Sequence, residues 1–192
     1  MDYQVDAAGR GPKKLQGLLT NVDSVLRVFG SWMMISIMVI VSADVFARYL
    51  FSSPFSWSYD LISVYLMPGV FFLFLSDTFQ QNGHVAVDIV QHRMRPIWRH
   101  GSLAISYACA VVVFGLILWV SVDRAWQSFS VGEVLAGGIA WPVWVAAAFV
   151  PVGVGMLLVR LLLGVVGHSL SVLAGRSVVP LPPLSGSEEA IL

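Results

Sequence analysis

Charged residues are scarce in this chain. Lysine, arginine, aspartate and glutamate together make up 11% of its 192 residues, whereas soluble domains carry about 25%. Hydrophobic residues make up 57%, and the formal net charge is zero. This composition is typical of an integral membrane protein, and it offers no basic field to which a nucleic acid would bind.

The chain also lacks the residues that most enzyme sites need. Its single cysteine, Cys109, can form neither an internal disulfide nor a multi-cysteine metal site. The HExxH of zinc hydrolases, the GxxxxGK[ST] phosphate loop and the GxSxG nucleophile elbow are all missing. The four histidines lie at the edges of apolar segments, not in mid-membrane, where a cytochrome would hold haem. We therefore expect no catalytic residue, no metal site and no cofactor.

The sequence is rich in long apolar segments instead. They predict an all-α integral membrane protein with four transmembrane helices, at about residues 28–50, 57–79, 98–122 and 139–166. A spanning helix needs about 20 mostly apolar residues, and its backbone groups must be satisfied internally. Pro142 suits the start of the fourth helix, whereas Pro68 should kink the second or loosen one of its turns.

The remaining segments surround this predicted membrane domain of residues 28–166. Lysine and arginine concentrate before the first span, between the second and third, and after the fourth. This distribution predicts that residues 1–27 and the largely disordered tail 167–192 both lie in the cytoplasm. Residues 83–95 have apolar and polar sides at helical spacing, which predicts a short amphipathic helix in the cytoplasmic interface.

One alternative would remove the first span. The apolar run ends in Val-Ser-Ala at residues 41–43, so it could be a signal peptide that is cleaved after Ala43. The charged leader is long, and the apolar stretch exceeds the 7–15 residues of a usual signal core. A retained helix is therefore the preferred interpretation.

Three charged residues interrupt the apolar sequence where the first span gives way to the second. Asp44 and Arg48 stand four residues apart, which lets them pair on one helix face. Asp60 follows Trp57, and it could instead reach Arg48 across the helical hairpin. Asp44, Arg48, Trp57 and Asp60 all lie close to the outer ends of the first two predicted spans. Because a helix rises about 1.5 Å per residue, they lie only several ångströms from the membrane surface. Structural or partner-contact roles are therefore favoured over an ion path.

The order of several short motifs resembles a known family. They are ARYLF at 47–51, FSWSYD at 55–60, NGHVAVDIV at 82–90 and IAWPVWVAAAFVPVG at 139–153. Together they resemble the small membrane subunit, DctQ type, of tripartite ATP-independent periplasmic (TRAP) transporters. One departure is Asp60, because the family commonly has glutamate after the tryptophan.

The resemblance implies a scaffold in the bacterial inner membrane and no enzyme. Its implied partners are a large DctM-type membrane subunit and a periplasmic DctP-type solute-binding protein, which together import organic acids with a sodium gradient. His84 and Asp88 lie in one of the matching motifs and join Asp44, Arg48, Trp57 and Asp60 as structural or partner-contact candidates. A membrane anchor for a redox or other enzyme complex, and a self-contained small channel or exporter, remain the alternatives.

Overall fold

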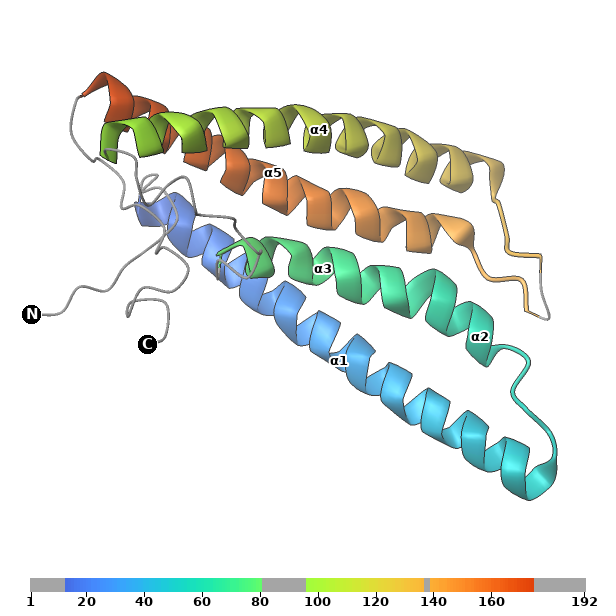
Figure 1. Ribbon diagram of the computed structural model, residues 1–192. Coiled ribbons are helices and arrows are strands. Elements are labelled where there is room, and N and C mark those ends of the chain that lie inside the picture. The colour runs from blue at the N-terminus through green and yellow to red at the C-terminus, as the bar shows by residue number, and fades with distance from the viewer. Residues whose placement is uncertain (1–12, 81–95, 137–138, 175–192) are drawn as a thin grey trace, which may run out of the picture.

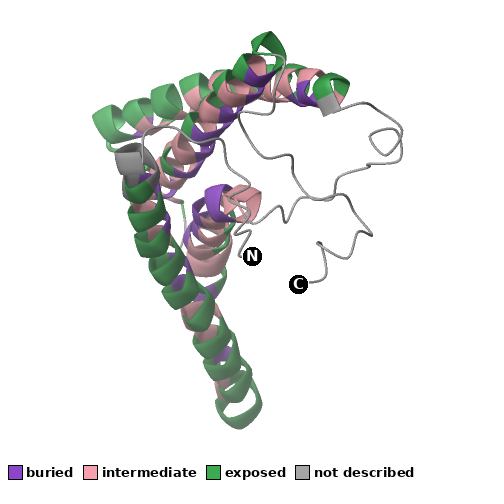
Figure 2. Cartoon of the chain, turned by 90° about the vertical axis from the view of Figure 1, so that its left-hand side faces the viewer, coloured by how far each residue is buried: buried purple, intermediate pink, exposed green. Residues whose placement is uncertain are grey.

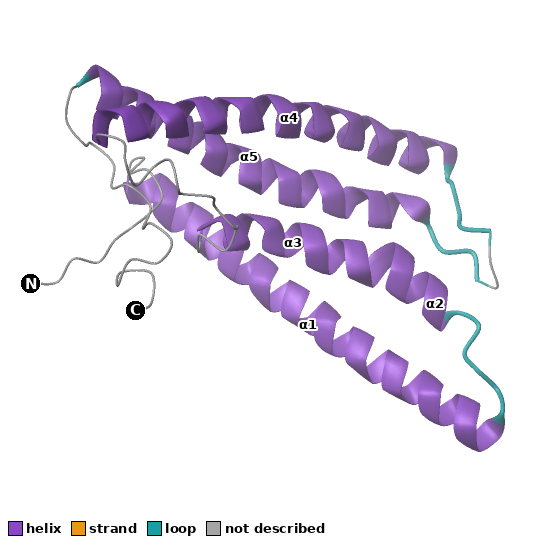
Figure 3. Cartoon of the chain, in the orientation of Figure 1, coloured by secondary structure: helices purple, strands orange, loops and turns teal. Residues whose placement is uncertain are grey.

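A computed structural model provides the structure of the chain. It describes residues 13–80, 96–136 and 139–174, and the structural statements below refer to these segments. Within them the chain is helical apart from its short connections (Figure 3). The predicted all-α fold is confirmed.

Four long helical segments make up the described structure (Figure 1). They are α1 (Lys13–Phe51), a composite second segment of α2 (Ser58–Asp60), η1 (Leu61–Leu66) and α3 (Met67–Gln80), then α4 (Pro96–Val131) and α5 (Val143–Leu173). Each is long and apolar enough to cross a bilayer. The first, third and fourth continue past the spans expected from the sequence, because polar residues near membrane surfaces extend the same helices.

The second segment changes helical type along its length. Residues Leu61–Leu66 form a π-helix, and the N–H of Met67 bonds to the carbonyl of Ile62, five residues earlier. Pro68 follows directly, and in a regular α-helix its ring would clash with the carbonyl of Val64. The wider π-turn avoids this clash, which is how the chain accommodates the loosened turn expected at Pro68.

The helices pack in the order α4, α5, α3, α1. Extensive contacts join α4 to α5, α5 to α3, and α3 to α1, and among the described helices no comparably extensive contact joins α1 to α4. The arrangement is therefore an open array with two edges, and Figure 1 shows α1 diverging from the other helices toward its C-terminal end. Exposed residues run along most of α1 in Figure 2, whereas buried ones gather on the central helices.

Small residues bring the central helices close together. A Cβ atom added at Gly153 of α5 would overlap the backbone carbonyl oxygen of Phe72 in α3, and one added at Gly69 would overlap the end of Met33 in α1. Leu73 and Leu157 are almost fully buried along the α3–α5 contact. Lipid tails are as apolar as these side chains, so close packing and polar bonds must hold the array together.

Candidate functional site

The Asp44 carboxylate organises the turn that connects α1 to α2. It accepts hydrogen bonds from Arg48 Nη2 at 2.8 Å, from the Phe55 backbone N–H at 2.7 Å and from Ser58 Oγ at 3.4 Å. Asp44 itself is only 9% exposed. We call these four residues the turn cluster, and its function within the chain is to fix the hairpin between the first two spans.

The backbone of this turn is shaped to meet the carboxylate. Ser52 follows the last residue of α1 and has a φ of 51°, in the left-handed region that ends a helix. The single hydrogen of Ser58 Oγ is shared between the Phe55 carbonyl at 2.8 Å and the more distant Asp44 carboxylate, and the ring of Phe55 stacks on Trp57 at 5.6 Å. The turn is therefore built from interactions between near neighbours in the sequence.

The sequence-predicted candidates meet only in part. Of the two carboxylates proposed for Arg48, the structure pairs it with Asp44. Asp60 ends α2, and among the described residues no ion pair joins it to Arg48. His84 and Asp88 lie outside the described residues, as does the expected amphipathic helix at 83–95.

A second polar cluster lies inside the array and joins three helices. Arg160 of α5 donates from Nε to Ser76 Oγ of α3 at 2.9 Å and from Nη2 to the Asp23 carboxylate of α1. Ser76 Oγ in turn donates to Asp23 Oδ1 at 3.1 Å. The side chains of Arg160 and Asp23 are 5% and 1% exposed. We call these three residues the core cluster.

A neighbouring ion pair extends the core cluster toward the edge of the array. Arg27 lies one turn after Asp23 in α1, and its Nη2 lies 3.3 Å from Oδ1 of Asp77, the residue after Ser76. The Asp77 side chain is 9% exposed, whereas that of Arg27 is half exposed. Two successive turns of α1 are thus tied to the last part of α3.

Burial makes the core cluster sensitive to the loss of either partner. An ion pair held in low dielectric is costly to desolvate, so its presence does not by itself stabilise the fold. Removing one member, however, leaves a charge that has neither water nor a counter-ion, which costs about 3–5 kcal/mol. The Asp23–Arg160 pair therefore favours one arrangement of α1, α3 and α5 over all those that would separate the two charges.

A pair of histidines joins α4 to α5 at the same end of the array. His100 near the start of α4 and His168 near the end of α5 are each 2% exposed, and their Nδ1 atoms lie 2.9 Å apart. One ring must donate a hydrogen from Nδ1 and the other must accept it. Tyr107 covers His168 with a ring separation of 5.4 Å. Across the described residues, no group of three or more histidine, cysteine or carboxylate side chains could hold a metal ion.

The connection from α4 to α5 is fastened at the opposite end of the array, the end at which the α1–α2 turn also lies (Figure 1). Glu133 accepts hydrogen bonds from Arg124 and from Ser128 Oγ, both at 3.0 Å. These two bonds hold the pKa of Glu133 below its usual value. Tyr65 of η1 donates to the backbone carbonyl of Pro142 at 2.5 Å, which ties this connection to the second span.

Sequence reasoning missed the core cluster and the histidine pair. Arg27 ends the segment 1–27 that the sequence predicts to be cytoplasmic, and Arg160 lies within the fourth predicted span, 139–166. A signal was present at Arg160, because apolar residues flank it on both sides for several positions. A charge enclosed in this way within a membrane helix predicts a buried partner. Nothing local indicates that the partner is Asp23, which lies 137 residues away.

Comparison with known proteins decides the family. The sequence model of the DctQ component of tripartite ATP-independent periplasmic transporters matches residues 37–169, which is more than half of the chain. The chain belongs to the DctQ family. Membership identifies a DctQ chain as a transporter component and a multi-pass membrane protein. No curated protein matches the sequence.

The family match covers the turn cluster completely and the core cluster only in part. It contains the whole turn cluster, together with Ser76 and Arg160 of the core cluster. Asp23 and Arg27 precede it. The carboxylate that neutralises Arg160 is thus contributed by a part of α1 that the family match does not include.

Proposed function

We propose that this DctQ chain is the scaffold subunit of a sodium-driven TRAP transporter that imports organic acids such as dicarboxylates. The observation that carries the proposal is the use of its intramembrane charges. Asp23, Asp44, Arg48 and Arg160 are engaged with other groups of the same chain. A protein that carried ions itself would need exchangeable polar sites along a path, whereas a scaffold needs fixed helices and an apolar exterior.

The proposed partners divide the work of transport. A large DctM-type membrane subunit would carry the substrate and sodium sites and would move against this chain. A DctP-type solute-binding protein would deliver the organic acid from the periplasm. With the basic segments in the cytoplasm, both termini of this chain lie inside and the turn cluster faces the periplasm. The subunit resides in the bacterial inner membrane in this assignment.

The site candidates take different roles in this proposal. Arg48 keeps 62% of its side chain exposed although it pairs with Asp44, so it can contact a partner without leaving the turn cluster. Trp57 and Asp60 lie at the start of the second span and are proposed to face the large subunit. His84 and Asp88 are proposed to lie on the cytoplasmic amphipathic segment, where they would contact lipid or the large subunit.

A deletion experiment tests the proposed function. Cells that lack this chain but retain the large subunit and the solute-binding protein should lose uptake of the organic acid. Binding of the solute by the purified periplasmic protein should be unchanged, and a plasmid copy of the chain should restore uptake. Normal uptake without the chain would refute the scaffold role. Solute flux through liposomes that contain this chain alone would favour the channel alternative.

A further inference from the structure

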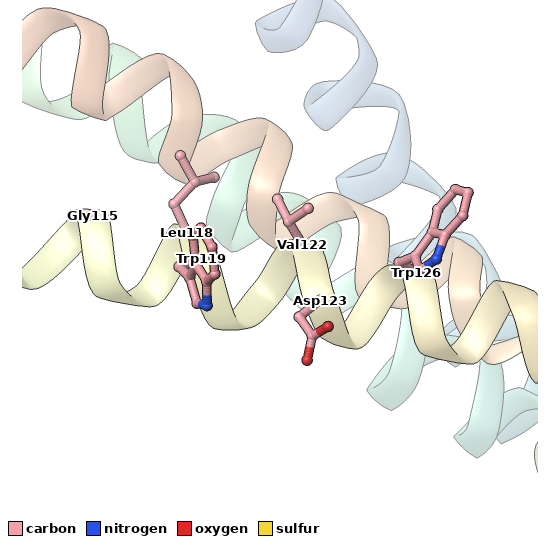
Figure 4. Close-up of a pocket in the computed structure, with 6 residues that line it drawn as sticks. All are labelled: Gly115, Leu118, Trp119, Val122, Asp123 and Trp126. Atoms are coloured by element: carbon pink, nitrogen blue, oxygen red, sulfur yellow. The ribbon is translucent and has the colours of Figure 1, made fainter.

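The outer face of α4 carries a groove that none of the polar clusters uses. It has a volume of about 480 Å³, within the roughly 300–1,000 Å³ of sites for small ligands, and Figure 4 shows the side chains that line it. They are Gly115, Leu118, Trp119, Val122, Asp123 and Trp126. All of them come from one helix at the edge of the array, which packs extensively against α5 only. The groove therefore opens toward the bilayer.

Asp123 is the polar residue of this otherwise apolar lining. Its Oδ2 atom accepts a hydrogen bond from Gln127 Nε2 at 2.7 Å. No ion pair involving Asp123 occurs in the part of the chain that the structure describes, and the adjacent Arg124 is bonded to Glu133. The carboxylate thus retains an oxygen, Oδ1, that can accept a further hydrogen bond. Its electrostatic complement is a cation with an N–H group.

The position of Asp123 along α4 places it at the level of lipid headgroups. It follows an uncharged stretch of 22 residues, 101–122, which is about 33 Å long at 1.5 Å per residue. The hydrocarbon core of a bilayer is about 30 Å thick. Gly115, Leu118 and Val122 consequently lie at acyl-chain depth, while Asp123 lies at the boundary with water.

Two indole rings flank the carboxylate along the helix. Trp119 and Trp126 stand one turn before and almost one turn after Asp123, and both are largely exposed. Indole faces attract cations, and tryptophan is favoured at the membrane interface. An ammonium group beside Asp123 would therefore lie in the interfacial zone that the two indoles favour.

We propose that this groove binds a phospholipid with a primary ammonium headgroup, of the ethanolamine type. The ammonium donates a hydrogen bond to Asp123, and one acyl chain lies along Gly115, Leu118 and Val122. A quaternary ammonium headgroup lacks the N–H donor, and an anionic headgroup is repelled by the carboxylate. A helix of a partner protein is the competing occupant, and in that case the purified chain shows no headgroup preference.

Native mass spectrometry of the purified full chain tests the proposal. The chain is equilibrated with equal amounts of phosphatidylethanolamine, phosphatidylcholine and phosphatidylglycerol, and the lipids that remain bound are counted. We expect ethanolamine lipid to be retained with about a two- to fivefold preference, as one exposed ion pair would give. Equal retention of the three lipids would overturn the proposal.

Three variants locate the preference. Asp123→Asn keeps the shape of the side chain and should abolish the headgroup preference, while Val122→Trp should reduce retention of all three lipids by filling the groove. Asp60→Asn removes one carboxylate at the start of the second span, outside the groove, and should keep the preference, so it serves as the matched control. A preference that survives in Asp123→Asn would refute the site. Because no partner subunit is present, these outcomes are independent of the proposed transport function.

Discussion

The turn cluster and the core cluster use the same chemistry over very different distances in the sequence. In the turn cluster, Asp44 binds Arg48, Phe55 and Ser58, all within 14 residues. In the core cluster, Arg160 binds Ser76 and Asp23, which are 84 and 137 residues away. The first shapes one hairpin near a membrane surface. The second determines how three helices are arranged, and it does so in a nearly dry environment.

The largest effect is expected from unpairing the core cluster. Arg160→Ala leaves the Asp23 carboxylate buried without a counter-ion, which should destabilise the chain by about 3–5 kcal/mol. Thermal unfolding in detergent, followed by size-exclusion chromatography of the remaining folded protein, would measure the loss. The double variant Asp23→Leu with Arg160→Leu should recover most of the stability, because no buried charge is left unpaired. If Arg160→Ala were as stable as the parent chain, Asp23 and Arg160 would not form a buried ion pair in the folded protein.

A somewhat smaller effect should follow from separating the helices beside the core cluster. In Gly153→Ala the new methyl group meets the Phe72 carbonyl, so α3 and α5 must move apart. Overpacking of this kind costs about 1–3 kcal/mol. Gly115→Ala is the matched control, because a Cβ there would lie at an ordinary 3.8 Å from Leu158. Equal melting temperatures for the two variants would contradict the close approach.

Removing the arginine of the turn cluster should affect the fold least. Arg48→Ala leaves Asp44 with its bonds from Phe55 and Ser58, and the arginine side chain is already 62% exposed. We expect the melting temperature of the isolated chain to fall by at most about 2–4 °C. Assembly with the large subunit, measured by co-purification, should fall more clearly if Arg48 contacts that subunit. If co-purification were unchanged, Arg48 would not be a contact of the large subunit.

The connection after α4 should respond to acid through Glu133. Hydrogen bonds from Arg124 and Ser128 lower the pKa of this carboxyl below its ordinary value of 4.5. The stability that these bonds contribute is therefore fully present above that value and is lost as the pH falls through the lowered pKa. Tryptophan fluorescence should report loosening of the connection in this acidic range. The Glu133→Gln variant should lack that transition, and an identical pH profile in the variant would contradict the assignment.

The contrast between the clusters also explains what could be predicted from sequence. Apolar segments of spanning length specify helices directly, and Asp44 with Arg48 at a spacing of four residues specifies a local pair. The loosened turn at Pro68 could likewise be predicted from sequence, because a proline without an N–H disturbs the helix in which it lies. The apolar residues around Arg160 predict that it has a buried partner, but they do not identify that partner. Asp23, Ser24 and Arg27 read as a polar leader, and no local rule extends α1 back through them or turns Asp23 toward α5.

The order of synthesis gives the distant pairing of Asp23 a further consequence. Asp23 leaves the ribosome 137 residues before Arg160, and at about 5–20 residues per second this interval lasts roughly 7–27 s. During that time Asp23 lacks the buried arginine with which it pairs in the complete array. Completion of α5 then brings the arginine, so the arrangement of α1, α3 and α5 that the core cluster favours can form only after the last helix has been made.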